Sequence, residues 1–576
     1  MFSNYDYDII IIGGGISGLF LTYKLSNTNL KIILIEGSDR LGGRINTIKK
    51  NNLSFEGGAA RFHTSHSKLI TLIDELNLLE DIIKLPEEIS YKLPKKSKIS
   101  VENLLKQSFE KKKDYHIDFL KNITYFQYLI TIFDFDTAEF IKESFGYDGE
   151  FIHLNAHAAL TMFEHDFFKD NDYFILKNGL SSIIDEITRI IELKENIIIK
   201  KNCTITDIDD NFVITDKKDK FYYDHLICAL PQKSLLSFEY FKDKDNDIQH
   251  LLNSVHPTPL LRIYAKYPTK NLWFKNIKRT ITNNYIRHII PIDYNNGLIM
   301  ISYTDDIYAN LWDKYNTISK SNSLSDDFLI EALHKEINEL FNITPPKPDF
   351  ISQIYWSEGI HLWKTGYDLN EVSENIIKPI ESKEIYICGE AYSIKQGWIE
   401  GCLDTCYNLL KKLPIDFHVV TDEYLCDIPD HLINIVQKDI INKDKKIHDK
   451  NIDDEKIDDK KVDDGKIDDK KEYTINEVLK LNNQDKEWII IEIDDKKIIF
   501  DISKWIPEHP GGSVIYNAIE ANDYYSNKKV KSEQSPTQLF MGNPIHKMKD
   551  KNGNDIFQRF FINQNEMIIR VGVLIS

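Results

Sequence analysis

Glycines at fixed spacing near the N-terminus are the first residues whose arrangement implies a chemistry. Gly13, Gly15 and Gly18 form a GxGxxG pattern. In this pattern the first glycine permits a tight turn, the second lets the backbone approach a pyrophosphate, and the third lets a helix pack on a strand. Glu36 follows 18 residues after Gly18, where a carboxylate would accept hydrogen bonds from a ribose. Together these residues indicate a dinucleotide-binding site.

The surrounding segments have the pattern that such a site requires. The apolar run YDIIII at residues 7–12 predicts a buried parallel strand, and a helix is expected from Ile16 to about Ser26. The first N–H groups of that helix would face the phosphates. A second apolar strand, KIILIE, ends at Glu36. A structural glycine turn is the alternative, but strand, glycines, helix, strand and acid all occur here in register.

A second group of glycines indicates which dinucleotide is bound. Glu36 is followed by GSDRLGGR, which ends in Gly42, Gly43 and Arg44. This run resembles the signature of the flavin amine oxidase superfamily, in which the second glycine pair lets the chain pass over the flavin. Residues 385–412, IYICGEAYSIKQGWIEGCLDTCYNLLKK, resemble the closing motif of the same superfamily. The resemblance covers essentially residues 5–412 and implies that both segments bind one FAD.

The resemblance also implies roles for single residues around FAD. Glu390 would hydrogen-bond the ribityl or pyrophosphate part, Ile205 would lie at the adenine end, and a helix starting near Trp398 would direct its dipole at the flavin ring. Thr365 and Gly366 occupy the place of the cysteine that links covalently to the flavin in some amine oxidases, so noncovalent FAD is expected. The expected FAD contacts are Gly13, Gly15, Ser17, Gly18, Glu36, Arg44, Gly58, Ala59, Arg61, Ile205, Gly389, Glu390, Trp398 and Ile399.

The same resemblance implies which residues contact the substrate. Arg61, in GGAARFHTSH, matches the arginine that binds the substrate carboxylate in amino acid oxidases, a role that suits a planar guanidinium. An arginine bound to the FAD phosphates or to a structural acid is the alternative. Trp398 and Tyr367 match the aromatic pair beside the flavin, Tyr367 only with one residue inserted after Trp356. For both, ordinary core packing is the alternative.

The implied reaction is the oxidation of an amine or amino acid to an imine, with dioxygen as the final acceptor. The residues expected to take part are Arg61, Arg262, Tyr367 and Trp398. Arg262 departs from the family pattern, because many members have a lysine near the reactive nitrogen of the flavin and arginine does not readily lose a proton. Two alternatives therefore stay open: a flavin dehydrogenase or desaturase that passes electrons to haem, and a non-catalytic structural protein that keeps FAD.

Histidines in the run FIHLNAHAALTMFEHDFF suggest a second kind of chemistry. His153 and His157 are one helical turn apart and would share a face. No third ligand spacing supports a metal site, so ordinary helix histidines are the preferred interpretation. His157 or His63 would act as a base only if it faced the substrate.

The C-terminal hundred residues resemble cytochrome b5. The runs YTINEVLKLNN and WIIIEIDDKKIIFDISKWIPEHPGG match its first half, where the histidine of His-Pro-Gly-Gly is an axial haem ligand. His509 takes that place, and the next histidine is His546. Haem b held by His509 and His546, His–Met ligation through Met541 or Met548, and a fold without haem are the alternatives. A tethered haem would be an electron-transfer partner of the flavin.

Length and composition divide the chain into three regions. Residues 1–413 are expected to be α/β, with a Rossmann-like FAD-binding domain interleaved with an α+β substrate domain. Residues 414–472 are expected to connect the domains and to end in a disordered linker, because the repeated KIDDK-like units have too few apolar residues to form a core. Residues 473–576 are expected to form a small α+β cytochrome b5-like domain.

Charge, hydropathy and cysteine usage exclude other classes of protein. A formal net charge of −18 argues against a nucleic-acid-binding surface. The sequence has neither an apolar run of 18 residues nor a signal-peptide pattern, so we expect no membrane span and a cytoplasmic location. The six cysteines are expected to be reduced and structural.

Overall fold

The structure is a computed structural model, and the chain forms two compact units, Met1–Ile452 and Asp453–Ser576. The residues that it describes are 6–50, 52–85, 89–93, 100–167, 172–242, 246–321, 327–415, 472–473, 488–493, 496–501 and 569–574. His509, His546 and nearly all of the expected linker at 414–472 lie outside them.

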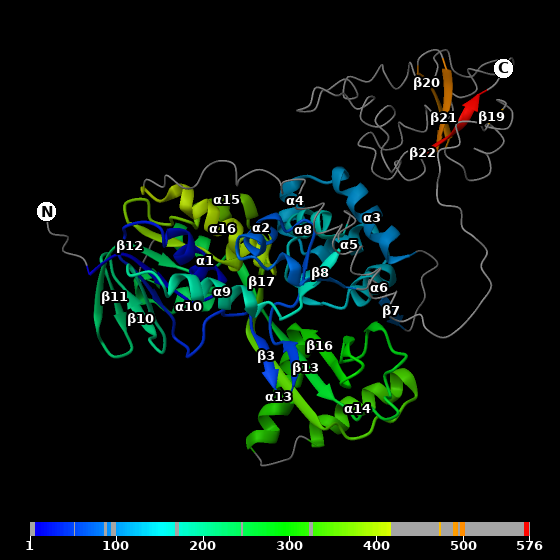
Figure 1. Cartoon of the computed structure of the whole chain (residues 1–576), viewed down its shortest axis with the longest axis horizontal. Coiled ribbons are helices and arrows are strands. Elements are labelled where there is room, and N and C mark those ends of the chain that lie inside the picture. The colour runs from blue at the N-terminus through cyan, green and yellow to red at the C-terminus, as the bar shows by residue number, and fades with distance from the viewer. Residues whose placement is uncertain are drawn as a thin grey trace. The chain divides into compact units, whose positions relative to one another are not determined.

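A seven-stranded sheet forms one part of the first unit and contains the strand that precedes the glycine motif (Figure 1). Its main path has the order β10-β11-β12-β1-β2-β9, and β18 pairs with β12. Pairings β12–β1, β1–β2, β2–β9 and β12–β18 are parallel, as in doubly wound folds. The strands are β1 (Tyr7–Ile12), β2 (Ile32–Ile35), β9 (Ile197–Lys200), β10 (Ile205–Ile208), β11 (Phe212–Thr215), β12 (Lys220–Cys228) and β18 (Ile385–Ile387).

Three helices pack side by side over this sheet. Helix α1 (Ile16–Leu25) contacts both α9 (Ser181–Ile191) and α16 (Ile399–Lys412). The expected strand and helix at the N-terminus are thus present, with the helix ending one residue before Ser26. Residues Ile9–Ile12 of β1 are buried, because a parallel sheet covered by other elements needs an apolar run rather than alternation.

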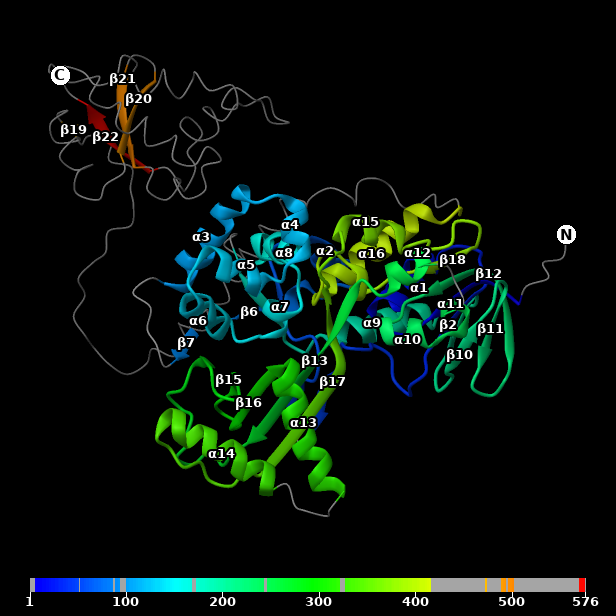
Figure 2. The ribbon, with the colours of Figure 1, turned by 180° about the vertical axis from the view of Figure 1, so that it is seen from behind.

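A six-stranded sheet has strands that come from between those of the first sheet in the sequence. Its order is β17-β13-β16-β15-β14-β7. Helix α13 (Asp306–Ser321) packs against β13 and β16, and α14 (Asp327–Phe341) packs against α13 (Figure 2). The strands are β7 (Ile89–Lys92), β13 (Val255–Lys266), β14 (Arg279–Thr282), β15 (His288–Asp293), β16 (Leu298–Asp305) and β17 (Phe350–Trp363). The mixed α/β fold with interleaved parts matches the expectation for this region.

The residues between 100 and 167 form a helical layer. Two of its helices begin at side chains that satisfy the first backbone N–H groups: Thr124 and Gln127 form a capping box on α5, and Asp134 caps α6. Gly146 ends α6 with a φ of 87°, a conformation that favours glycine. The helices are α3 (Val101–Lys111), α4 (Ile117–Asn122), α5 (Tyr125–Ile132), α6 (Phe135–Phe145), α7 (Gly149–Ile152) and α8 (Ala156–Phe167).

Short elements complete the first unit, with small sheets β3-β4 and β5-β8-β6. They are β3 (Thr47–Lys50), β4 (Leu53–Glu56), β5 (Phe62–His63), β6 (Ile82–Lys84), β8 (Tyr173–Leu176), α2 (Ser67–Glu75), α10 (Gln232–Ser237), α11 (Glu239–Lys242), α12 (Asn246–Leu252), α15 (Leu369–Asn375) and the 3-10 turns η1 (Leu79–Asp81), η2 (Lys112–Asp114) and η3 (Glu390–Tyr392). Among the described helices none has the length and apolar character needed to span a bilayer.

In the second unit the described residues form one four-stranded sheet of order β19-β22-β21-β20. Strands β20 and β21 are antiparallel, as are β21 and β22, whereas β19 runs parallel to β22. The strands are β19 (Glu472–Tyr473), β20 (Trp488–Ile493), β21 (Lys496–Asp501) and β22 (Ile569–Leu574). The paired β20 and β21 come from the WIIIEIDDKKIIFD run quoted for the cytochrome b5 resemblance.

Candidate functional site

A cavity of about 730 Å³ is lined by residues from both large sheets and from the helical layer. Its lining brings together segments that lie more than 350 residues apart, from Ile12 to Cys402. The expected site residues that line it are Gly13, Gly15, Ser17, Glu36, Arg44, Gly58, Ala59, Arg61, Ile205, Arg262, Gly389, Glu390, Trp398 and Ile399. The sequence motifs at the two ends of the region therefore meet at one cavity.

The three glycines of the first motif have different surroundings. A Cβ on Gly13, whose φ is 104°, would lie 2.4 Å from the Ala229 carbonyl oxygen, and one on Gly18 would lie 2.0 Å from the Gly13 carbonyl oxygen. A Cβ on Gly15 would meet nothing within 4 Å. Gly13 and Gly18 are thus needed for chain packing, whereas Gly15 leaves open space at the N-terminus of α1.

Glu36 lies against the same loop. One carboxylate oxygen accepts a hydrogen bond from the Gly14 N–H at 2.7 Å, and the other accepts from Ser38 through its N–H at 2.8 Å and its hydroxyl at 2.7 Å. A carboxylate has about four lone-pair positions, so Glu36 keeps capacity for a ribose hydroxyl. Glu36 lines the cavity, and its contact with a ribose stays a prediction.

The second glycine pair packs directly on the first glycine loop. The Gly42 N–H donates to the Gly14 carbonyl at 2.8 Å, and Gly15 forms an isolated parallel bridge with Gly42. Arg40 donates to the Gly43 carbonyl at 2.6 Å and so holds the turn. A Cβ on Gly43 would lie 3.2 Å from the Gly15 Cα, which explains why a small residue is needed there.

Glu390 is the centre of a buried ionic group. Its carboxylate accepts from Arg44 at 2.7 Å, from the His361 ring at 2.8 Å, and from the Gly397 N–H at 2.9 Å. Burial alone would raise the pKa of Glu390, but the charges and hydrogen bonds of Arg44 and His361 hold it well below its ordinary value. A fourth hydrogen bond comes from the His361 backbone N–H at 2.9 Å, one more than Glu36 accepts. The carboxylate was expected to contact FAD itself; in the structure its four protein partners fill its acceptor positions, so it positions Arg44 and Gly397.

Trp398 stands at the start of α16 and lines the cavity. Its indole packs edge-on against His63 and His66, at centroid distances of 5.1 and 4.7 Å. Burial and the charges of His63 and Lys395 hold the pKa of His66 well below its ordinary value. These aromatic neighbours fix the indole beside the helix terminus whose dipole was expected to face the flavin.

Arginines and tyrosines lie close together in the cavity wall. The Arg61 guanidinium lies over the Tyr173 ring at 4.7 Å, and the Arg262 guanidinium lies over the Tyr303 ring at 4.6 Å. Arg262 also donates to the Glu56 carbonyl at 3.0 Å. Arg279 is a third arginine of the lining, and burial together with the charge of Arg61 lowers its pKa.

Sequence reasoning missed several of these lining residues. Arg279 is on β14 and Tyr303 on β16, so no local motif connects either of them to Arg61. Tyr147 and Tyr173 also line the cavity. The missed residues come from separate elements, and their only sequence signal was an aromatic or basic residue type, which is common throughout the chain.

Asp305 forms part of the cavity wall at the end of β16. Its carboxylate accepts from the backbone N–H of Asp148 at 3.0 Å and from that of Gly149 at 2.7 Å. Burial and the neighbouring Asp148 raise the pKa of Asp305 to about 7. Arg287, fully buried, donates to Asp148 at 2.9 Å, so this group joins α7 to the six-stranded sheet.

Tyr367 is not among the residues that line the cavity. It follows the end of β17 at Trp363, and its ring packs on His250 at 4.5 Å. Tyr367 lies beyond the end of β17, whereas the part of this strand that lines the cavity is residues 356–360. The aromatic residue of this segment in the lining is Trp356, whose Nε1 donates to the Gly57 carbonyl at 2.7 Å.

Other side chains considered from the sequence also lie outside the lining. Lys266 forms an ion pair with Asp349 at 2.9 Å, so it does not replace the lysine whose place Arg262 takes. His63 and His157 do not line the cavity either. The described cysteines are all free and buried: Cys203, Cys228, Cys388, Cys402 and Cys406.

The fold and the glycine loop in the cavity wall are those of a flavoprotein with a dinucleotide-binding loop. The chain belongs to the family of flavin containing amine oxidoreductases, whose family model matches residues 16–408. It is thus an FAD-dependent enzyme of the amine oxidase kind.

Individual relatives agree with this family. An uncharacterized protein of Acanthamoeba polyphaga mimivirus is 23% identical over 486 residues, which cover 71% of this chain and 94% of the relative. The flavin-containing amine oxidase A of Sus scrofa is 33% identical over 72 residues, 12% of this chain and 14% of that protein. Among solved structures, a putrescine oxidase double mutant superimposes with a TM-score of 0.56 at 15% identity, covering 70% of this chain and 99% of that chain. This last likeness concerns the fold.

Proposed function

We propose that this enzyme oxidises a small amine that carries a carboxylate, such as an amino acid, to the imine. The observation that supports this substrate class most directly is the group of Arg61, Arg262 and Arg279 in the cavity wall. Guanidinium groups beside a buried cavity favour an anionic ligand, and a planar fork binds a carboxylate through two hydrogen bonds. Acidic residues such as Glu150 and Glu358 also line the cavity, so amines that lack a carboxylate are the comparison that tests this assignment.

FAD, when bound, supplies the acceptor for the hydride equivalent, and dioxygen is the proposed final acceptor. The residues of the chain hold it in place. Gly15 and the N-terminus of α1 receive the pyrophosphate, Glu36 receives the ribose, and Ile205 lies at the adenine end. Arg61 orients the substrate carboxylate, and the indole of Trp398 confines the amine beside the ring and excludes water.

The test uses the full-length protein loaded with FAD under argon. Amino acids are compared with their decarboxylated amines, which have the same side chain but lack the carboxylate. Loss of the flavin absorbance near about 450 nm with amino acids alone supports the proposal. Bleaching by the amines or by polyamines alone would overturn the carboxylate assignment.

Substitution of the arginine tests the same point at the residue. Arg61→Ala should raise KM for the amino acid by roughly 10- to 100-fold, since a hydrogen bond to a charged group contributes about 1.5–3 kcal/mol. Arg189→Ala, on the exposed side of α9, is the matched control and should leave KM unchanged. Equal KM values for both variants would assign Arg61 to the alternative role, at the FAD phosphates or a structural acid.

For the second unit we propose a cytochrome b5-like domain that exchanges electrons with the flavin. The His-Pro-Gly-Gly run at 509–512 supports it, with His509 and His546 as the proposed haem ligands. A sharp Soret band in the full-length protein that His509→Ala removes, while flavin absorbance persists, is the expected result. Full-length protein that has no Soret band after expression with added haem precursor would contradict the haem assignment. Peroxide release on turnover separates an oxidase from a dehydrogenase that passes its electrons to haem.

A further inference from the structure

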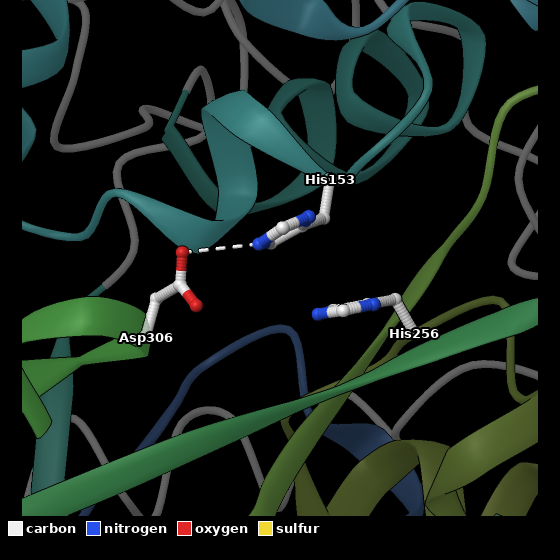
Figure 3. A group of neighbouring side chains, drawn as sticks. All are labelled: His153, His256 and Asp306. Carbon is white, nitrogen blue, oxygen red and sulfur yellow. Dashed lines mark hydrogen bonds and ion pairs between the residues drawn. The ribbon is translucent and has the colours of Figure 1, made fainter. Parts of the chain in front are cut away.

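Two histidines and an aspartate from three separate elements meet outside the cavity (Figure 3). His153 follows α7, His256 is the second residue of β13, and Asp306 is the first residue of α13. One ligand atom of each lies within 4.8 Å of those of the other two. The His153 Nε2 and Asp306 Oδ2 atoms are 3.0 Å apart.

The two imidazole rings lie face to face and both direct an edge toward Asp306 (Figure 3). Their centroids are 3.9 Å apart and their planes differ by 21°. Two protonated imidazoles would repel each other at this distance. A neutral imidazole is the form that binds a metal ion.

We propose that His153, His256 and Asp306 bind a divalent transition-metal ion, with Zn²⁺ as the best match. Two imidazole nitrogens and one carboxylate oxygen are a donor set that zinc uses, with water in the fourth position. Lys233 and Lys364 contribute positive charge near His256, which opposes any cation. Because two of the three ligands are imidazoles, the site favours an ion with strong affinity for imidazole and disfavours Ca²⁺ and Mg²⁺, which prefer oxygen ligands.

The arrangement also shows which partner His153 has, since the sequence suggested His157. His157 is one helical turn from His153 in the sequence, but it is not part of this group; the second histidine is His256, about a hundred residues away. Asp306 has a φ of 46°, an unfavourable conformation for a residue other than glycine. Such local strain persists where the surrounding structure or a bound ligand holds the residue.

A metal ion here would connect the helical layer to the six-stranded sheet beside the cavity wall. Asp305, directly before Asp306, already holds the N–H groups at the start of α7. The ion would therefore strengthen the same junction between α7 and the six-stranded sheet. Because it binds only the folded chain, zinc should raise the melting temperature of the protein.

The experiment uses full-length, FAD-loaded protein from which metal has been removed with a chelator. Zinc chloride is titrated while bound zinc and melting temperature are measured. His256→Asn should bind one equivalent less zinc than the wild type and should lose the zinc-dependent rise in melting temperature. His116→Asn is the matched control, because His116 also lies beside an aspartate, at 3.4 Å from Asp118, but has 77% of its side chain exposed.

Calcium chloride should produce no comparable shift in the wild type. Asp306→Asn provides a second variant if His256→Asn loses its flavin or unfolds, and it should weaken zinc binding at least about tenfold, since it removes the charged ligand. Equal zinc stoichiometry and equal melting shifts in wild type, His256→Asn and Asp306→Asn would overturn the proposal. The comparison of variants separates this site from any zinc bound by the second unit.

Discussion

At the scale of single residues, Gly15 differs from Gly13 and Gly18 in the space around it: an added Cβ at Gly15 would meet no other atom within 4 Å. Gly13 and Gly18 face backbone atoms, so their side chains are excluded by the protein itself. Gly15 faces the cavity. Only this glycine can therefore be replaced without disturbing the fold, and its replacement should act on the cofactor alone.

Gly15→Val should fold but bind FAD at least about tenfold more weakly, because the branched side chain would fill the space at the start of α1. The flavin absorbance of purified protein and a titration of the apo-protein with FAD measure this effect. Gly13→Ala is the contrasting variant: its Cβ would meet a carbonyl oxygen, so it should lower the unfolding free energy itself. Normal FAD affinity in Gly15→Val would contradict the proposed place of the pyrophosphate.

His256 should make stability depend on pH. Its pKa is lowered to about 4 by burial, His153 and two lysines, although Asp306 acts in the opposite direction, whereas in the unfolded chain it is about 6.5. Between these values the unfolded chain binds the proton first, so the unfolding free energy falls as the pH decreases from about 6.5 to 4.

Urea unfolding in the presence of EDTA at pH 7.5, 6 and 5 can measure this dependence. The difference in unfolding free energy between wild type and His256→Asn should shift against the wild type as the pH falls. A difference that stays constant over this range would show that His256 is protonated equally in the folded and unfolded chains.

At the scale of elements, the junction between α7 and β16 depends on one carboxylate. Asp305 satisfies two backbone N–H groups that no helical partner could satisfy, because they lie at the start of α7. The buried pair of Arg287 and Asp148 lies beside it. This junction holds the helical layer, which contributes Tyr147 and Glu150 to the cavity.

Asp305→Ala should lower the unfolding free energy by about 2–4 kcal/mol, since two buried N–H groups lose their acceptor. Denaturant unfolding of the FAD-loaded protein measures the loss. Asp185→Ala, an exposed carboxylate on α9, is the control and should change the unfolding free energy by less than about 0.5 kcal/mol. A loss no larger than that of the control would mean that α7 does not depend on this contact.

At the scale of the whole molecule, one cofactor is expected to join segments from both ends of the first unit. Residues 12–17 and 389–402 contribute to the same cavity, so FAD binding and folding of this unit should be coupled.

FAD at about 100 times its dissociation constant should stabilise the first unit by about 2.7 kcal/mol, and the melting temperature should rise by a few degrees. Riboflavin is the control, because it lacks the pyrophosphate and adenosine that Gly15, Glu36 and Ile205 would bind. It should give a smaller rise. Equal shifts with FAD and riboflavin would contradict the assignment of the glycine loop.

The sequence alone determined features whose residues lie close together in the chain. The glycine spacing, the apolar strands at 7–12 and 32–35 and the acid at Glu36 lie within thirty residues, and their backbone requirements can be read directly from residue type. The second motif at 385–412 could be assigned through its resemblance. These segments correspond to β1, α1, β2, β18 and α16 and to most of the residues proposed to bind FAD.

Only the tertiary structure decided which distant side chains meet. Tyr303 meets Arg262 because β16 pairs with β13, and Arg279 lies on β14 of the same sheet. Both line the cavity together with Arg61, whereas Tyr367 lies beyond the end of β17 and outside the lining. His256 and Asp306 join His153 for the same reason. Pairing of strands far apart in the chain depends on packing and register, which no local spacing encodes.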